Sequence, residues 1–142
     1  MEQVDFYLLG PVDETTRLTT ACRIANKAYE RRMRIYLQTA DREQSELLDK
    51  LLWTFSQESF VPHTLRNSLT DWKQYPVQIG VGDSGVAGLD LLISLQAAVP
   101  ADAEKYKRVA DLVMDNTEQK QLGRARFRYY REKGVEPKTH QL

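Results

Sequence analysis

Short apolar runs alternate with longer amphipathic stretches over the first 55 residues, and this alternation limits the folds open to the chain. Residues 4–9 form a compact apolar run that Gly10-Pro11 stops, which is typical of a buried strand. Asp13 can cap a helix with one apolar face, and the run at 33–38 is rich in β-forming residues.

A second helix is predicted to begin after Asp41, because Gln44 three residues later completes a capping box before an apolar stripe at 47–55. The order strand, helix, strand, helix is typical of a parallel sheet with right-handed crossovers. The predicted fold class is therefore α/β, with a mostly parallel sheet flanked by helices.

The middle of the chain is less regular. Residues 56–76 hold two prolines among polar residues and are expected to be mostly loop. Two further strands are predicted at 76–79 and 89–95, the second apolar enough to be central in the sheet. Residues 109–114 fit either a fifth strand or the end of a helix. No repeat or linker interrupts the chain, which predicts one domain.

The composition predicts a soluble protein with no overall field toward nucleic acid or membrane. Hydrophobic residues make up 42% of the chain, and 20 Lys and Arg balance 20 Asp and Glu. The single cysteine, Cys22, is expected to be a small buried core residue in a reducing compartment. No apolar run approaches the ~18 residues of a membrane span, and the acidic N-terminus is unlike a signal peptide. We therefore expect a cytoplasmic location.

The segment Gly80-Val81-Gly82-Asp83-Ser84-Gly85 matches the letters of the dinucleotide-binding G-x-G-x-x-G motif. That motif requires a helix to begin directly after the glycines, so that its N-terminus faces the pyrophosphate. Here a strand-like run follows instead. We interpret the segment as a loop between two strands.

Neither histidine has a partner at metal-ligand spacing, and no C-x-x-C, H-E-x-x-H or Walker motif is present. His63 follows Pro62 in the predicted loop and is expected to be an ordinary exposed or hydrogen-bonded side chain. His140 lies near the C-terminus. The sequence predicts no catalytic activity, no metal and no cofactor.

Residues 118–133 are predicted to form a terminal helix that Gly134 ends, with Pro137 just beyond. Segment 117–142 carries seven Lys and Arg against three Asp and Glu. At about 100° per residue, Phe127 falls inside a stripe of cations on one face of this helix. The cations are Lys120, Arg124, Arg128 and Arg131.

The opposite face of this helix is predicted to contact the core through Leu122, Ala125 and Tyr129. Cations around an aromatic ring suit a ligand with both acidic and apolar groups. Single-stranded nucleic acid offers phosphates and stacking bases, whereas an acidic peptide offers carboxylates and a hydrophobic anchor. A solvated basic face, with Phe127 partly covered by arginine stems, is a third interpretation. The residue pattern alone leaves all three open.

A second patch lies in the proline-bearing loop, where Phe60 and Val61 fall outside any helical stripe. Two interpretations are open. The side chains can tuck back into the core, or they can form an exposed apolar contact for a partner.

Several segments together, in their order along the chain, resemble the DNA polymerase III chi subunit family. They are VDFYLLG, LLWTF followed by ESFVPH, PVQIG, LDLLISL and QLGRARFRYYREKG. The resemblance covers nearly the whole chain, and its most specific parts are the tryptophan-to-SFVPH segment and the C-terminal helix. It implies a single non-enzymatic Rossmann-like domain over residues 1–142, without a nucleotide site.

The resemblance also implies partners. Members of this family pair with the psi subunit, which connects them to the clamp loader, and bind the acidic, phenylalanine-ended tail of single-stranded DNA-binding protein. The positions that match the tail site are Val113, Arg124, Phe127 and Arg128, beside Lys120 and Arg131 on the basic face. The positions that match the psi contact are Phe60, Val61, Pro62 and His63. The resemblance thus favours an acidic protein tail over nucleic acid.

Overall fold

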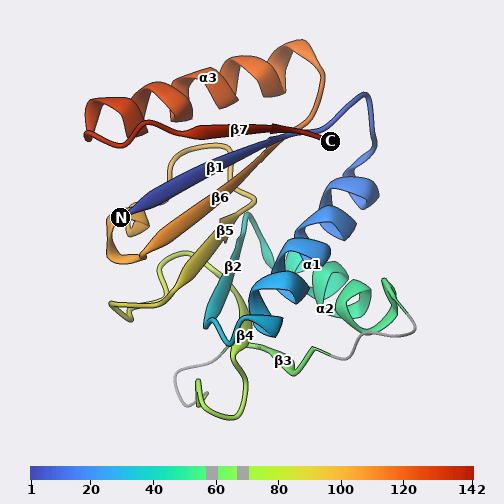
Figure 1. Cartoon of the computed structure of the whole chain (residues 1–142). Helices are drawn as coiled ribbons and strands as arrows, with labels where there is room; N and C mark the ends of the chain where they lie inside the picture. The colour runs from blue at the N-terminus through green and yellow to red at the C-terminus, as the bar shows by residue number, and fades with distance from the viewer. Residues whose placement is uncertain (57–60, 67–70) are drawn as a thin grey trace.

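The computed structural model describes residues 1–56, 61–66 and 71–142, and it is built on a seven-stranded sheet whose strand pairs are all parallel (Figure 1). The strands are β1 (Gln3–Leu8), β2 (Ile35–Thr39), β3 (His63–Leu65), β4 (Val77–Val81), β5 (Leu91–Ser94), β6 (Arg108–Val113) and β7 (Lys138–Gln141). Their order across the sheet is β3-β4-β2-β5-β6-β1-β7. The predicted α/β class and parallel sheet are confirmed.

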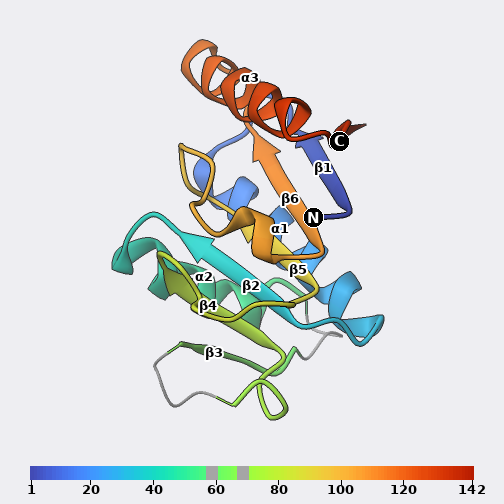
Figure 2. The same cartoon turned by 90° about the vertical axis from the view of Figure 1, so that its left-hand side faces the viewer.

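The helices that cover the sheet are α1 (Glu14–Glu30), α2 (Arg42–Thr54), α3 (Thr117–Glu132) and the short 3-10 helix η1 (Ala103–Lys105). Asp13, Asp41 and Asn116 cap the three α-helices by accepting a hydrogen bond from a backbone N–H. Helices α1 and α2 lie on one face of the sheet, and α3 and η1 lie on the other (Figure 2). Within the ranges that the structure describes, none of the helices has the length and apolarity needed to cross a bilayer.

The sheet separates two apolar cores, because successive side chains of a strand point to opposite faces. On β2, Ile35 and Leu37 pack against α1 and α2, whereas Tyr36 lies between them in sequence and packs in the core on the α3 side. Cys22 is buried in the α1 core, as predicted, and burial raises the pKa of its thiol to about 12. Such a thiol is not available as a nucleophile at neutral pH.

Two edge strands are absent from the sequence prediction. The structure has β3 inside the stretch 56–76, for which mostly loop is expected, and β7 after the predicted terminal helix. Both strands have four residues or fewer and lack an apolar run, so periodicity carries no signal for them. The open choice at 109–114 is resolved as strand β6.

The sequence predicts that α3 contacts the core through Leu122, Ala125 and Tyr129. This prediction is confirmed for Tyr129, which packs partly buried against the core on the α3 side, but it misses the buried face of the helix. The buried residues of α3 are Gly123, Arg126 and Tyr130, and Ala125 is exposed. An arginine is ordinarily assigned to the surface, but Arg126 forms a bidentate ion pair with the buried Asp111, at N–O distances of 2.7 and 3.0 Å. This pair rotates α3 so that its cationic stripe borders the core rather than facing away from it.

Strand β7 is held to β1 by a buried carboxylate as well as by backbone pairing. Asp5 accepts hydrogen bonds from His140 at 2.8 Å, Gln3 at 2.9 Å and Arg108 at 3.3 Å. His140 also stacks on Tyr7, with ring centroids 4.9 Å apart. Burial by itself raises the pKa of Asp5, but the three hydrogen bonds together hold this pKa below its ordinary value.

Replacing Asp5 by asparagine is expected to lower the free energy of unfolding at pH 7 by about 1–3 kcal/mol. Because the folded pKa is lowered, this contribution is present above the unfolded pKa of about 3.9 and is lost as pH falls through the folded value. Urea unfolding of the wild type and D5N between pH 7 and pH 3 measures the difference. A difference that stays constant over this range would contradict the assignment.

Candidate functional site: a groove beneath α3

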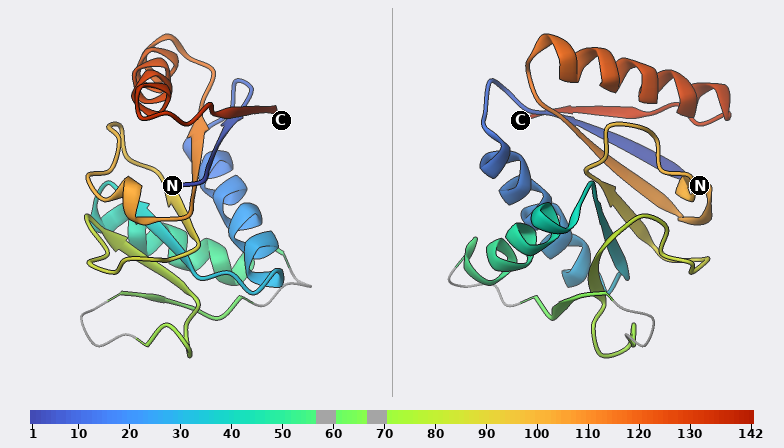
Figure 3. Two further views of the ribbon diagram at one scale, coloured as in Figure 1. Left: turned by 60° about the vertical axis from the view of Figure 1, so that its left-hand side comes forward. Right: turned by 180° about the vertical axis from the view of Figure 1, so that it is seen from behind.

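A groove lies between α3 and the carboxyl-terminal ends of β1 and β6, with β7 along its side. Both views of Figure 3 place α3 over this edge of the sheet, away from β3. The volume of the groove is about 920 Å³. Ligands of parallel α/β sheets commonly bind outside the carboxyl ends of the strands. The position of this α3 groove therefore follows from the fold.

The floor of the α3 groove is apolar. Phe6 of β1 and Val113 of β6 are buried beneath it, and Phe127 packs on Phe6 with ring centroids 5.2 Å apart. Gly123 allows α3 to approach the sheet here, because a Cβ atom at this position would lie 3.0 Å from a Val113 methyl. The groove thus offers a shallow seat for an apolar side chain.

The rim of the α3 groove is cationic, but its four cations differ in their partners. Lys120 Nζ lies 2.5 Å from an oxygen of Asp115, and Arg131 Nε lies 3.2 Å from an oxygen of Glu136. Arg124 and Arg128 are exposed and make no ion pair with any described residue. These two guanidinium groups are four residues apart, so they lie on one side of the helix. They can receive carboxylates without first breaking an internal contact.

All six residues assigned to the tail site and basic face line this one groove. They are Val113, Lys120, Arg124, Phe127, Arg128 and Arg131. The sequence does not predict the contributions of Phe6, Asp115, Thr139 and Gln141, which also line it. Phe6 lies in a predicted strand, but only the pairing of distant segments reveals that its ring lies under α3.

The segment assigned to psi separates into two parts. Phe60 lies outside the described residues. Val61 is 1% exposed and packs in the α1 core. The structure therefore supports the interpretation in which this side chain tucks back into the core. His63, the first residue of β3, is also buried. Its Nδ1 lies 2.7 Å from the Val61 carbonyl oxygen, and its Nε2 lies 3.2 Å from the Asp49 carbonyl oxygen. The expectation of a hydrogen-bonded histidine is confirmed, and the loop assignment at this position is wrong. Pro62 is partly buried beside it.

An apolar surface remains next to this segment. Trp53 is 54% exposed and packs its ring against His63, with centroids 4.6 Å apart. Leu65, two residues further along β3, is also exposed. Exposed apolar side chains that cluster on one side of a small domain are typical of a protein contact.

The glycine segment forms the predicted loop between two strands from Gly82 onward, whereas Gly80 and Val81 end strand β4. It joins β4 to β5, and Gly82 and Gly85 have φ of 78° and 71°, which favours glycine there. No α-helix begins within residues 82–90. The segment therefore lacks the helix N-terminus that the dinucleotide motif requires.

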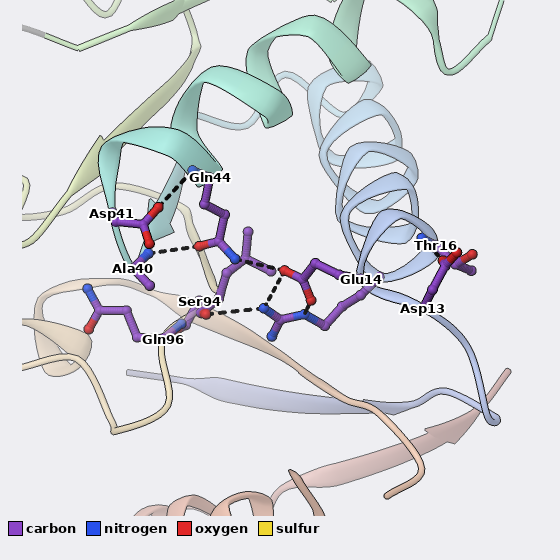
Figure 4. Close-up of polar contacts among 10 residues, drawn as sticks. Asp13, Glu14, Thr16, Ala40, Asp41, Gln44, Ser94 and Gln96 are labelled. Atoms are coloured by element: carbon purple, nitrogen blue, oxygen red, sulfur yellow. Dashed lines mark hydrogen bonds and ion pairs between the residues drawn. The ribbon is translucent and has the colours of Figure 1, made fainter.

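The N-terminus of α1, which follows the first strand, is the other position where a phosphate could bind in this fold. Asp13 accepts a hydrogen bond from one N–H group of this helix end, that of Thr16, at 2.8 Å. The Glu14 carboxylate accepts a hydrogen bond from the Gln44 side chain at 2.8 Å, which connects α1 to α2 (Figure 4). It also accepts two hydrogen bonds from the Arg17 guanidinium, each at 2.9 Å. This helix end thus presents carboxylates, which repel a phosphate. Among the described residues, no group of His, Cys, Asp and Glu is arranged to hold a metal ion.

The fold is similar to domains of larger solved structures. The crystal structure of T4 UvsW matches with a TM-score of 0.69 and 9% identity, over 99% of this chain and 41% of that chain. A DEAD box protein from the hyperthermophile Methanococcus jannaschii matches with a TM-score of 0.57 and 13% identity, over 100% of this chain and 42% of that one. The chain thus spans about two fifths of these proteins, and at such identities the likeness concerns the fold alone.

Closer relatives match over the full length. DNA polymerase III subunit chi of Pseudomonas aeruginosa is 39% identical over 142 residues, covering 100% of this chain and 98% of the relative. The Escherichia coli subunit is 31% identical over 144 residues, covering 98% and 97%. The sequence pattern of the family described as DNA polymerase III chi subunit, HolC, matches residues 1–138. The chain therefore belongs to the DNA polymerase III chi subunit family, whose members are non-catalytic accessory subunits of that polymerase.

Proposed function

We propose that the chain is a cytoplasmic adaptor that holds the acidic C-terminal tail of single-stranded DNA-binding protein in the α3 groove. Arg124 and Arg128 pair with carboxylates of the tail, and Phe127 and Val113 help to seat its terminal phenylalanine. The observation that carries this proposal is that Arg124 and Arg128, which make no ion pair with a described residue, lie beside an apolar floor. Such a groove suits a ligand with carboxylates next to one apolar anchor.

Direct binding of single-stranded nucleic acid is the competing function for the same helix. Two features count against it. The chain has no net charge, and its basic stripe on α3 is small, whereas affinity for a nucleic-acid backbone grows with the number of phosphates that the protein neutralises. Stacking of successive bases also requires exposed aromatic faces, whereas Phe127 is partly buried against Phe6.

Titration calorimetry with a synthetic acidic peptide that ends in phenylalanine tests the proposal. We expect a dissociation constant in the micromolar range, roughly −8 kcal/mol, which weakens as salt rises. A peptide without the terminal phenylalanine should bind more weakly, because the apolar floor stays unfilled. Binding of an oligonucleotide alone, with no binding of the peptide, would overturn the proposal in favour of nucleic acid.

The second proposed contact joins the chain to psi, and through psi to the clamp loader. It uses Phe60, Val61, Pro62 and His63, the last of which packs against the exposed ring of Trp53. The buried Val61 and His63 hold this segment against the sheet and α2. We assign these two residues a structural role, and we assign the direct contact with psi to Phe60.

Replacing Phe60 by alanine is expected to abolish co-purification of a psi subunit, because a large aromatic anchor commonly contributes 2 kcal/mol or more to an interface. The matched control is Arg128→Ala, which should bind the acidic peptide more weakly but keep psi. The Phe60→Ala chain, conversely, should bind the peptide normally. Loss of both partners in both variants would contradict two separate contact surfaces.

A further inference from the structure

One carboxylate inside the α3 groove has the same charge as the proposed ligand. Asp115 lies between β6 and α3 and lines the groove, and its oxygen lies 2.5 Å from Lys120 Nζ. Its backbone is fixed, because Asp115 N–H donates to the Gly10 carbonyl at 3.4 Å and the next residue, Asn116, caps α3. Lys120 lies in the first turns of the same helix, and its N–H donates to the Asn116 carbonyl at 2.9 Å. Carboxylate and ammonium are thus positioned to meet.

This ion pair makes Lys120 unlike Arg124 and Arg128, although all three line the same groove. A carboxylate of a bound peptide that approaches Lys120 must share its ammonium with Asp115 or replace Asp115. The pair is accessible to solvent, with about half of each side chain exposed. Separating Lys120 from Asp115 therefore costs little free energy. The other paired cation, Arg131, differs because its partner Glu136 lies outside the groove lining.

We propose that Asp115 is an internal competitor that occupies Lys120 and weakens the hold of the α3 groove on acidic peptides. This inference rests on the proposed function, because it assumes that the groove binds such a peptide. Asp115 restricts the strong anion contacts to Arg124 and Arg128, which keeps the tail complex weak enough to exchange. It also opposes a carboxylate at the α3 N-terminal end of the groove, where a helix end would otherwise attract one.

Titration of one acidic, phenylalanine-ended peptide into four proteins tests the inference: wild type, D115N, K120M and the double variant. We expect D115N to tighten binding about two- to fivefold at low salt, because Lys120 becomes available to the ligand. In the K120M background the same change should tighten binding less than about twofold, because only the repulsion by Asp115 is removed. The difference between the two gains measures the competition.

The matched control is Glu46→Gln on α2, which removes one carboxylate from an exposed ion pair with Arg42. It changes the net charge by the same amount but lies on the other face of the sheet, so peptide affinity should not change. Equal gains from D115N with and without Lys120, or no gain at all, would overturn the inference while peptide binding by the wild type stands. Failure of the wild type to bind the peptide would overturn the proposed function as well. Thermal unfolding of each variant checks that α3 is intact.

Discussion

Replacing Arg128 by alanine is expected to weaken binding of the acidic peptide about tenfold, and Arg124→Ala should have a similar effect. A hydrogen bond to a charged group contributes about 1.5–3 kcal/mol, and 1.4 kcal/mol corresponds to a factor of ten in affinity. Both guanidinium groups are exposed at the groove and bind no described carboxylate, so their removal should leave the fold intact. Calorimetric titration of each variant measures the loss directly.

The matched control for both variants is Arg23→Ala. Arg23 is an exposed arginine on α1, on the opposite face of the sheet. Its removal lowers the net charge by the same amount but should change peptide affinity less than about twofold, by screened long-range attraction alone. Normal peptide binding by Arg128→Ala, or an equal loss in Arg23→Ala, would refute the assignment of the site to α3.

Replacing Arg126 by methionine is expected to lower the free energy of unfolding by about 3–5 kcal/mol. Arg126 is 4% exposed and makes two short hydrogen bonds to Asp111 and a third to the Ala97 carbonyl at 2.7 Å. Burial raises the pKa of Asp111, and the guanidinium opposes this shift by stabilising the carboxylate. Without Arg126, the buried carboxylate loses the cation that donates two hydrogen bonds to it, and Arg17 acts on it only through its charge. Urea unfolding at neutral pH measures the cost.

The control for this prediction is Arg42→Ala, which breaks the exposed pair with Glu46. The Arg42 side chain is 91% exposed, so its removal should cost no more than about 1 kcal/mol. A combined change of Arg126 to methionine and Asp111 to leucine should recover much of the stability, since it leaves no buried charge unpaired. A cost below about 1 kcal/mol for the single Arg126 variant would contradict a structural role for the pair.

Much of the sheet could be predicted from local pattern. The alternation of apolar runs and capped amphipathic stretches predicted β1, α1, β2 and α2 in order, and the capping residues Asp13 and Asp41 lie where expected. The short edge strands β3 and β7 could not be predicted in this way. Their stability comes from pairing with β4 and β1, which are distant in sequence, rather than from their own residues.

The site was predicted in part. Helical spacing placed Phe127 among the cations, and the structure gathers these residues at one groove. Spacing correctly placed Tyr129 against the core but missed the buried face of α3, which includes Arg126. The error has a physical cause: hydrophobicity alone places an arginine outside, whereas a buried arginine is stable when a buried carboxylate such as Asp111 compensates its charge.

The sequence by itself determined the α/β class, the location of the basic helix and the family to which the chain belongs, because these depend on residue order and local periodicity. Only the tertiary structure decided that the basic helix borders a groove. That groove requires Phe6, Val113 and β7 to meet under α3, and it requires the Arg126–Asp111 pair to set the rotation of the helix. It also decided which cations are available to a ligand, since the partners of Lys120 and Arg131 lie in the segments just before and just after α3 and depend on how these segments fold against the helix.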